Sequence, residues 1–378
     1  MSGAMRGPAP AAELVVDLDT YRENLGVLRE LAPASQQMAV VKANGYGHGM
    51  VPIARAARDA GADWLGVARP EEALALRSAG DGGPVLCWLE TPGAPFAELV
   101  DAGIEVTASS ADQLEEILAM APSRPRVQLK VDTGLSRNGA RFGADWSSLV
   151  RAAARAQAGG RVEITGIWSH FACADEPDNP ASAEQEAVFT AAVDELRGAG
   201  VEPGLRHLSN SAGILTRPSA HLDLVRVGIA AYGIDPDPAV RFSGIRPVLT
   251  ARARLAQVKE VEAGARVSYG YRWTADRPTR LGLVPVGYGD GLHRTASSRA
   301  EMGYGGRRVP VRGTICMDQC VIDLGELPAR RGDRVTLFGP GDDGEPSAED
   351  WALAAGTIGY EIVTRLMGRW TRTYRGGR

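Results

Sequence analysis

Three lysines are the residues whose chemistry stands out in this chain. The 378 residues include 42 lysines and arginines together, yet lysine occurs only at Lys42, Lys130 and Lys259. Either residue type can supply a solvated surface charge, but a lysine amine can also lose its proton when buried and can condense with a carbonyl group. Lys259, in the strand-like segment QVKEV, is expected to be solvent-exposed, which leaves Lys42 and Lys130 as candidates for chemistry.

Lys42 closes the first of eight short apolar runs and is followed by the segment ANGYGHG. At the end of a buried strand, such a lysine serves either as a Schiff-base amine or as a structural ion-pair partner, and the sequence leaves both roles open. Polar or small residues also follow or close the later runs: His170, Asn210, Ser211, Arg226, Gly228 and Ile229. Residues capable of chemistry therefore gather at the carboxyl ends of the runs.

The eight apolar runs predict the fold that positions these residues. They begin at Met38, Trp64, Pro84, Glu105, Arg126, Glu163, Leu205 and Leu224. Segments with helical periodicity lie between most of them, one with Pro70 near its start and one after a candidate cap at Ser110. This alternation predicts parallel strands with right-handed crossovers, and eight units close a TIM-like (β/α)8 barrel. An open, doubly wound sheet is the competing interpretation.

A second domain follows the barrel. Beyond residues 235–238 the chain changes to alternating strand-like segments separated by Gly, Pro and Asp turns, which predicts a mainly antiparallel β domain. The segments include RVSYGY and RRVPVRGTICMDQCVIDLG, and one helical stretch interrupted by two glycines follows Ser347. We expect the barrel at 13–240 and the β domain at 241–378, with residues 1–16 packing against the second domain.

A phosphate site is expected at the barrel mouth. Barrels commonly bind phosphate through backbone N–H groups and hydroxyls after strands 7 and 8, where this chain has Ser211 and the bare Gly228. A lysine amine and a phosphate cradle in one barrel mouth indicate pyridoxal 5′-phosphate as the cofactor. The segment GYGHG lacks the spacing of a dinucleotide or P-loop motif.

Composition excludes several classes of function. The net charge is only −4 and the basic residues are scattered, so neither a nucleic acid nor a membrane surface is an expected partner. No apolar run approaches the ~20 residues of a membrane span, and the N-terminus lacks an apolar signal region. Four cysteines do not suggest a disulfide framework. No motif has metal-ligand spacing. We expect a cytoplasmic protein without a metal.

The chain closely resembles the bacterial alanine racemases, pyridoxal-phosphate enzymes of fold type III. The resemblance covers residues 13–375 and rests on nine segments in order: VVKANGYGHG, VDTGLSRNG, WSHFACADE, HLSNSAG, LVRVGIAAYG, VSYGY, VPVGYGDG, GTICMDQ and IGYEIVTRL. It implies interconversion of L-alanine and D-alanine, which supplies D-alanine for peptidoglycan. It also implies a head-to-tail homodimer with shared active sites.

The resemblance assigns the two proton carriers that racemisation needs on opposite faces of the substrate. Lys42 would hold the cofactor and act as one base. Tyr269, from the partner subunit's β domain, would be the other. His170 would lie near Tyr269 and Arg226, where a cation could favour the phenolate. Arg226 would face the pyridine nitrogen, where decarboxylases of the same fold present an acid.

Further roles follow from the resemblance. The residues expected to hold the phosphate are Tyr46, Ser211, Gly228, Ile229 and Tyr360, with Asn210 beside them. Arg137 would contact the cofactor's phenolic oxygen and the substrate carboxylate, helped by the backbone N–H of Met317 of the partner subunit. Lys130 lies where relatives often carry an N-carboxylated lysine that orients this arginine.

Substrate size would be limited by a gate rather than by a deep pocket. The expected gate residues are Asp175, Tyr288, Arg294, Ile358 and Tyr360. Thr314 stands where some family members have arginine, which puts the gate's charge in doubt. A decarboxylase of the same fold, a racemase of broader range and a non-catalytic pyridoxal-phosphate carrier remain as alternatives. The carrier would lack the β domain.

Overall fold

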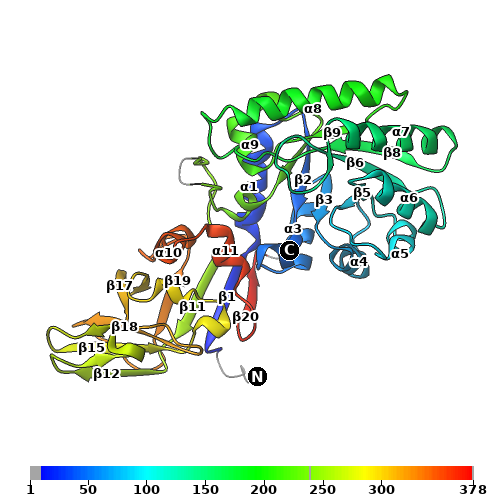
Figure 1. Cartoon of the computed structure of the whole chain (residues 1–378). Helices are drawn as coiled ribbons and strands as arrows, with labels where there is room; N and C mark the ends of the chain where they lie inside the picture. The colour runs from blue at the N-terminus through cyan, green and yellow to red at the C-terminus, as the bar shows by residue number, and fades with distance from the viewer. Residues whose placement is uncertain (1–9, 238–239, 377–378) are drawn as a thin grey trace.

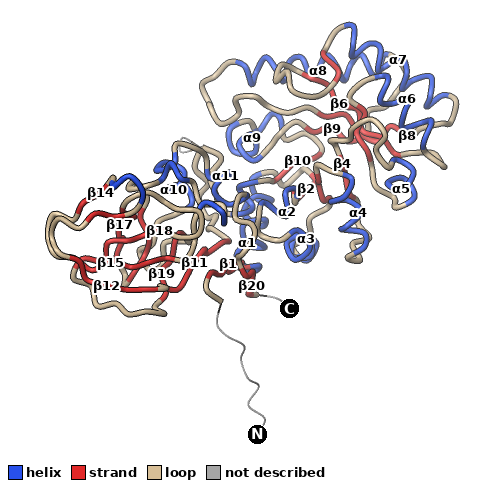
Figure 2. The backbone as a smooth tube through the Cα atoms, turned by 60° about the horizontal axis from the view of Figure 1, so that its bottom comes forward, coloured by secondary structure: helices blue, strands red, loops and turns tan. Residues whose placement is uncertain are grey.

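A barrel and a β domain lie side by side in the computed structural model, which describes residues 10–237 and 240–376 (Figures 1 and 2). All eight apolar runs form strands of the barrel. These are β2 (Gln36–Val40), β3 (Trp64–Val67), β4 (Val85–Cys87), β5 (Val106–Ala108), β6 (Arg126–Asp132), β8 (Glu163–Trp168), β9 (Leu205–His207) and β10 (Leu224–Val227). The strand pairs among them are parallel.

The barrel is closed by contacts between two four-strand groups. Strands pair in the orders β10-β2-β3-β4 and β5-β6-β8-β9. A parallel bridge between Leu86 and Glu105 joins β4 to the start of β5. Across the other gap, the Asp223 amide donates to the Arg206 carbonyl oxygen at 3.1 Å. The (β/α)8 prediction is confirmed, and the open doubly wound sheet is wrong.

Helices cover the outside of the barrel (Figure 1). They are α1 (Leu18–Leu31), α3 (Met50–Asp59), α4 (Pro70–Ser78), α5 (Phe96–Asp101), α6 (Ala111–Met120), α7 (Ala144–Ala158), α8 (Ala181–Gly198) and α9 (Ser211–Thr216). Pro70 opens α4, and the Ser110 hydroxyl accepts from the Gln113 amide to cap α6, as the sequence predicts. No helix among the described residues has both the length and the apolar character needed to cross a membrane.

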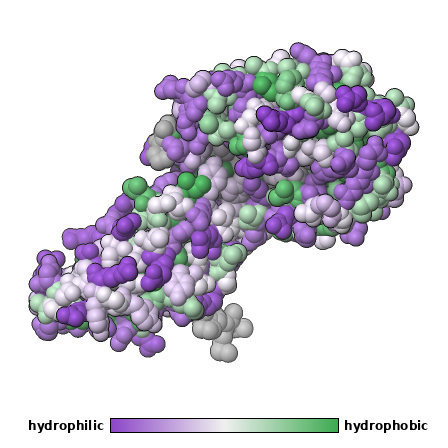
Figure 3. Space-filling model, viewed as in Figure 1, coloured by the Kyte–Doolittle hydropathy of each residue, from purple (hydrophilic) through white to green (hydrophobic). Residues whose placement is uncertain are grey.

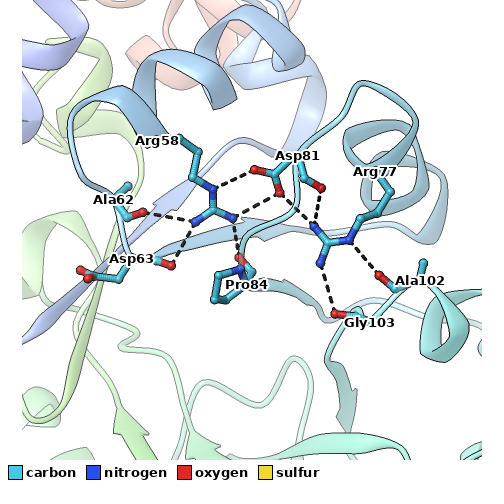
Figure 4. A network of polar contacts seen from close by, with 8 residues as sticks. All are labelled: Arg58, Ala62, Asp63, Arg77, Asp81, Pro84, Ala102 and Gly103. Carbon is cyan, nitrogen blue, oxygen red and sulfur yellow. Dashed lines mark hydrogen bonds and ion pairs between the residues drawn. The ribbon is translucent and has the colours of Figure 1, made fainter.

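An arginine network ties the amino ends of the barrel strands together (Figure 4). Asp81 accepts from Arg58 Nε at 2.8 Å and from Arg77 Nη1 at 2.9 Å. Arg58 also donates to the carbonyl oxygens of residues 62, 63 and 84, and Arg77 donates to those of residues 102 and 103. Three loops that enter successive strands are thereby joined, on the face of a barrel that serves stability rather than chemistry.

The β domain is built on one nine-stranded sheet. Its order is β12 (Gln257–Val261), β15 (Thr279–Val284), β18 (Cys320–Gly325), β17 (Arg307–Arg312), β16 (Glu301–Tyr304), β19 (Arg334–Phe338), β11 (Leu249–Arg254), β1 (Ala12–Asp17) and β20 (Thr371–Arg375). Pairing is antiparallel except between β1 and β20. The expected mainly antiparallel domain is confirmed, and Lys259 is exposed on β12.

Residues 10–16 of the N-terminal segment reach this sheet through β1, whereas residues 1–9 lie outside the described residues. The chain passes from β1 directly into α1 of the barrel. Hydrophilic residues cover most of the face seen in Figure 3, and hydrophobic ones appear there in small scattered groups.

Two local predictions need correction. The segment RVSYGY is not a continuous strand, because Ser268, Gly270 and Tyr271 have φ of 63°, 73° and 47° and turn the chain out of the extended conformation. Tyr269 therefore lies in the 3-10 turn η3 (Tyr269–Tyr271). The helical stretch after Ser347 divides into α10 (Ala348–Ala355) and α11 (Gly359–Thr364), because Gly356 ends the first helix in the left-handed region.

Candidate active site

A cavity of about 290 Å³ opens at the carboxyl ends of the barrel strands. Eleven residues singled out from the sequence line it: Lys42, Tyr46, Lys130, Arg137, His170, Asn210, Ser211, Arg226, Gly228, Ile229 and Tyr360. Val40, Trp88 and Trp168 complete the lining. Four of these side chains are lysines or arginines, and none of the described residues that line the cavity is an aspartate or glutamate. The cavity is therefore suited to an anionic ligand.

Lys42 is presented by an unusual backbone turn rather than by the strand itself. Strand β2 ends at Val40, and the turn labelled α2 (Lys42–Tyr46) follows. Ala43, Asn44 and Tyr46 have φ of 53°, 55° and 50°, a region that costs non-glycine residues of order 1–3 kcal/mol each. The Glu72 carboxylate accepts from the Ala43 amide at 2.6 Å and holds the start of this turn.

The described lining of the cavity offers Lys42 no carboxylate, which disfavours the ion-pair alternative, and only the charge of Glu72 outside the lining acts to raise its pKa. Burial, followed by the charge of Arg137, lowers the pKa of Lys42 below its ordinary value. Burial and the charge of Arg226 lower the pKa of Lys130 to about 7. The Lys130 amine sits 4.0 Å from the centroid of the Trp168 ring. Both shifts favour the neutral amine that nucleophilic chemistry requires.

Arg226 carries a positive charge buried at the cavity floor, where its residue is 4% exposed. Its Nη2 donates to the carbonyl oxygens of Ser169 and Leu208 at 2.7 and 2.9 Å and approaches His170 Nδ1 at 3.3 Å. Burial lowers the pKa of Arg226 to about 9, which leaves it protonated at neutral pH. Burial and Arg226 hold the pKa of His170 well below its ordinary value. Arg226 is therefore the cation expected beside His170, and His170 itself is neutral.

A chain of hydrogen bonds runs from Arg226 through the barrel interior, and sequence reasoning missed it. Arg226 Nη1 lies 3.1 Å from His207 Nδ1, His207 Nε2 lies 2.7 Å from Gln128 Oε1, and Gln128 Nε2 donates to Glu105 at 2.8 Å. Because a guanidinium only donates, His207 Nδ1 accepts and its Nε2 carries the proton. The buried carboxylate of Glu105 is thus linked to Arg226 by hydrogen bonds through two neutral side chains, Gln128 and His207.

Small groups line the expected phosphate side of the cavity. The Gly228 amide donates to the Ser211 hydroxyl at 3.0 Å. A Cβ at Gly228 would lie 2.8 Å from the Tyr46 hydroxyl and would fill the space between them. Asn210 accepts from the Gly213 amide and caps α9 while also lining the cavity. Burial and the charge of Asp175 raise the pKa of Tyr360, which keeps its phenol protonated.

The remaining predicted residues do not line the cavity of their own chain. Tyr269 is 73% exposed and lines a separate, open hollow of the β domain with Cys316. The other exposed members of the predicted set are Tyr288, Arg294, Met317 and Ile358. Asp175, in contrast, is half-buried on the barrel near Tyr360. One chain therefore does not bring Tyr269 beside His170.

Thr314 is buried rather than part of a gate. It is 3% exposed, and its hydroxyl donates to the Tyr269 carbonyl oxygen at 2.9 Å. The Ser268 hydroxyl donates back to the Thr314 carbonyl oxygen at 2.6 Å. In this chain the side chain at position 314 therefore makes a structural contact, which holds the turn that carries Tyr269, rather than contributing to the charge of a gate.

Comparison with known proteins gives the same result over both domains. The family models "Alanine racemase, N-terminal domain" and "Alanine racemase, C-terminal domain" match residues 16–236 and 248–374. The chain belongs to the alanine racemase family. The alanine racemase of Thermobifida fusca is 51% identical over 369 residues, covering 97% of this chain and 98% of the relative. That of Streptomyces coelicolor is 50% identical over 373 residues, covering 96% and 95%.

Solved structures of alanine racemases agree with the fold. The alanine racemase from a D-cycloserine-producing Streptomyces lavendulae superposes with a TM-score of 0.96 at 49% identity and covers 98% of both chains. The alanine racemase from Streptomyces coelicolor superposes with a TM-score of 0.94, also at 49% identity, and covers 96% of this chain and 98% of its own. The predicted resemblance is confirmed, and as an alanine racemase the chain is an isomerase.

The Thr314 contact makes a prediction for this racemase. Thr314→Val keeps the shape of the side chain but removes a hydrogen bond worth about 1 kcal/mol, so the turn that carries Tyr269 loosens. If Tyr269 transfers protons, kcat for alanine falls roughly fivefold, while Thr314→Ser, which keeps the hydroxyl, stays near wild type. Steady-state kinetics of both variants measure this. An unchanged kcat in Thr314→Val contradicts a positioning role.

Proposed function

We propose that this chain interconverts L-alanine and D-alanine with pyridoxal 5′-phosphate bound in the barrel cavity, and so supplies D-alanine for peptidoglycan. The supporting observation is the cavity itself. Two lysines with lowered pKa values and two arginines line it, and no described residue of the lining is a carboxylate. A phosphate-bearing aldehyde supplies the anion and the carbonyl that such a lining favours. Four free thiols accord with a cytoplasmic location.

The residues of the cavity fit this cofactor. Lys42 would hold its aldehyde carbon through Nζ. The residues that would hold its phosphate are Tyr46, Asn210, Ser211, Gly228, Ile229 and Tyr360. A Cβ at residue 228 would lie against the Tyr46 hydroxyl, so the absence of a side chain there would leave room for phosphate oxygens. Arg137 would pair with the phenolic oxygen and with the substrate carboxylate.

Arg226 favours racemisation over decarboxylation. When bound, pyridoxal 5′-phosphate withdraws electrons from the α-carbon of the attached amino acid and makes its proton easier to remove. A guanidinium donates hydrogen bonds to a ring nitrogen without transferring a proton at neutral pH. Glu105, the carboxylate behind it, is separated from Arg226 by Gln128 and His207. With the cofactor bound, an arginine would therefore take the place of the acid-to-ring contact expected of a decarboxylase.

Two bases on opposite faces would carry the proton. Burial and Arg137 lower the pKa of Lys42, so the amine can accept the α-proton on its face once it is released from the cofactor. Tyr269 of the partner subunit would protonate the other face. Tyr269 is exposed and lines a hollow separate from its own cavity, which supports its action in the cavity of a second copy in a head-to-tail homodimer. Met317 of the partner subunit would add a backbone N–H.

The gate would form where the partner's β domain meets the barrel. Asp175, Ile358 and Tyr360 would contribute from one chain, because Ile358 caps the helix that carries Tyr360, and Tyr288 and Arg294 would contribute from the partner subunit. The side chains of Tyr288 and Arg294 are exposed on a single chain, as residues that close another chain's cavity must be. A narrow opening made in this way would admit alanine and hinder larger amino acids, and this would distinguish the enzyme from a racemase of broader range.

Mixed dimers test the shared site. Lys42→Ala and Tyr269→Ala chains, each inactive alone, should recover up to about a quarter of wild-type alanine racemisation when refolded together, because half of randomly paired dimers carry one complete site. Racemisation is measured starting from L-alanine and from D-alanine, and serine is used to test the range of substrates. Mixtures of either chain with a Lys259→Ala chain serve as assembly controls. Absence of recovery, with dimers present, rules out the shared site.

Lys130 is proposed to be N-carboxylated. The neutral amine attacks carbon dioxide, forms a carbamate and releases one proton, which turns a neutral group beside Arg137 into an anion. Since the pKa of Lys130 is about 7, the amine is mainly neutral at pH 8 and mainly protonated at pH 6. Carbon-13 NMR in labelled bicarbonate should therefore show a carbamate signal that is strong at pH 8 and weak at pH 6. Lys130→Arg should abolish it and Lys259→Arg should not. No signal at pH 8 refutes the modification.

A further inference from the structure

The last strand of the chain contacts both halves of the candidate active site. Residues 368–375, here called the C-terminal strap, follow α11 and enter strand β20, which pairs with β1 between the barrel and the β domain (Figure 1). Register in this pairing is regular from Glu13 with Thr371 to Asp17 with Arg375. This ladder fixes the backbone of Arg372 and Tyr374, and it begins two residues after Arg369, so the two arginines stay close along the chain.

At its first end the strap holds two loops of the β domain. Arg369 donates through Nε and Nη2 to both oxygens of Asp290, at 2.6 and 2.9 Å, and through Nη1 to Asp318 at 2.7 Å. Asp290 is buried, and the neighbouring Trp370 ring N–H donates to its carbonyl oxygen at 2.9 Å. A bidentate arginine on a buried carboxylate is a strong and directional contact.

These two loops carry residues proposed to serve the partner's cavity. Asp290 ends the 3-10 turn η4 (Tyr288–Asp290), and Asp318 follows Met317 directly. The loops also bond to each other, since the Gly289 amide donates to the Met317 carbonyl oxygen at 2.8 Å. By bridging Asp290 and Asp318, Arg369 sets where Tyr288 and Met317 stand relative to each other.

At its other end the strap holds the turn that presents Lys42. Arg372 Nε donates to the Gly47 carbonyl oxygen at 2.9 Å, and its Nη2 donates to the Leu366 carbonyl oxygen at 2.7 Å. The Tyr374 hydroxyl lies so close to Gly49 that a Cβ there would be 2.1 Å away. The turn from Lys42 to Gly49 contains positive-φ residues whose strain must be held by surrounding contacts. The strap supplies contacts of this kind.

We propose that Arg369 and Arg372 are positioning residues that serve different active sites of the dimer. Arg372 holds the Lys42 turn of its own cavity, whereas Arg369 holds the loops that complete the partner's cavity. The proposal rests on the shared site proposed above. It assigns a function to the C-terminal segment, and it predicts that the effect of each substitution depends on which chain carries it.

Mixed dimers with a single complete site provide the test. Pairing a Lys42→Ala chain with a Tyr269→Ala chain leaves one complete site, made from Lys42 of the second chain and Tyr269 of the first. Arg369→Ala should lower kcat/KM about tenfold when placed in the Lys42→Ala chain and have little effect in the other. Arg372→Ala should show the opposite dependence. Equal losses in either placement indicate general destabilisation and overturn the proposal.

Controls and a second measurement separate positioning from unfolding. Arg375 lies exposed on the same strand, so Arg375→Ala should leave kcat/KM unchanged in whichever chain of the mixed dimer it is placed. Arg372→Lys, which keeps one donor, should recover part of the loss. Hydrogen exchange of the holoenzyme dimer should quicken in residues 43–49 with Arg372→Ala and in residues 287–291 with Arg369→Ala. Exchange that is unchanged, or that quickens equally throughout the chain, overturns the proposal.

The mixture without strap substitutions distinguishes failure of the shared active site from failure of the strap proposal. If the pair without strap substitutions recovers no activity, the shared site fails. Hydrogen exchange in the Arg369→Ala and Arg372→Ala homodimers then decides the strap separately. If the reference pair is active and the substitutions act alike in both chains, the strap proposal fails while the shared site stands.

Discussion

A positive charge buried beneath the barrel mouth is the constraint on which the site depends. Arg226 is 4% exposed and has no carboxylate partner among the described residues. Carbonyl oxygens and neutral imidazoles surround it instead, because a buried guanidinium must be hydrogen-bonded to be tolerated. Burial, followed by this charge, keeps His170 and His207 neutral and lowers the pKa of Lys130. Burial and the charge of Arg226 therefore act together on the pKa values of the neighbouring bases in the cavity.

Backbone strain supports the second requirement, the placement of Lys42. Successive positive-φ residues carry the chain from β2 into the cavity, and contacts from Glu72 and the C-terminal strap hold them there. A relaxed turn would move both Lys42 and Tyr46, since they stand at the two ends of α2. Strain retained in a native fold points to a functional demand, and here the demand is for an amine and a phenol in one small cavity.

Much of the barrel could be predicted from the sequence, because its signals are local. Runs such as that at Met38 are apolar on both sides, as strands buried in a parallel barrel must be. The scarcity of lysine pointed to Lys42 and Lys130, and both line the cavity. The turn at Tyr269 was mistaken for a strand, because alternating residues such as VSYGY suit either conformation until Ser268 adopts a positive φ.

Other parts of the site depend on contacts between distant segments, which no local pattern encodes. Glu105 and Gln128 lie on different strands from His207, and they meet only because the barrel closes. Trp88 lines the cavity directly after β4 without a motif to mark it, whereas Trp168 begins the segment WSHFACADE but is not singled out there as a site residue. Thr314 resembled a gate position by its place in the chain, whereas its hydroxyl in fact lies beneath Tyr269. Burial and distance, rather than residue type, assign these roles.

Attachment of the cofactor to Lys42 is the central claim, and borohydride labelling tests it most directly. Borohydride fixes a lysine that carries pyridoxal 5′-phosphate as a stable pyridoxyl-lysine, which peptide mapping by mass spectrometry locates. The account predicts the label on the peptide that contains Lys42, with complete loss of label in Lys42→Arg. A label on Lys130, or alanine racemisation by a protein that takes up no label, would contradict it.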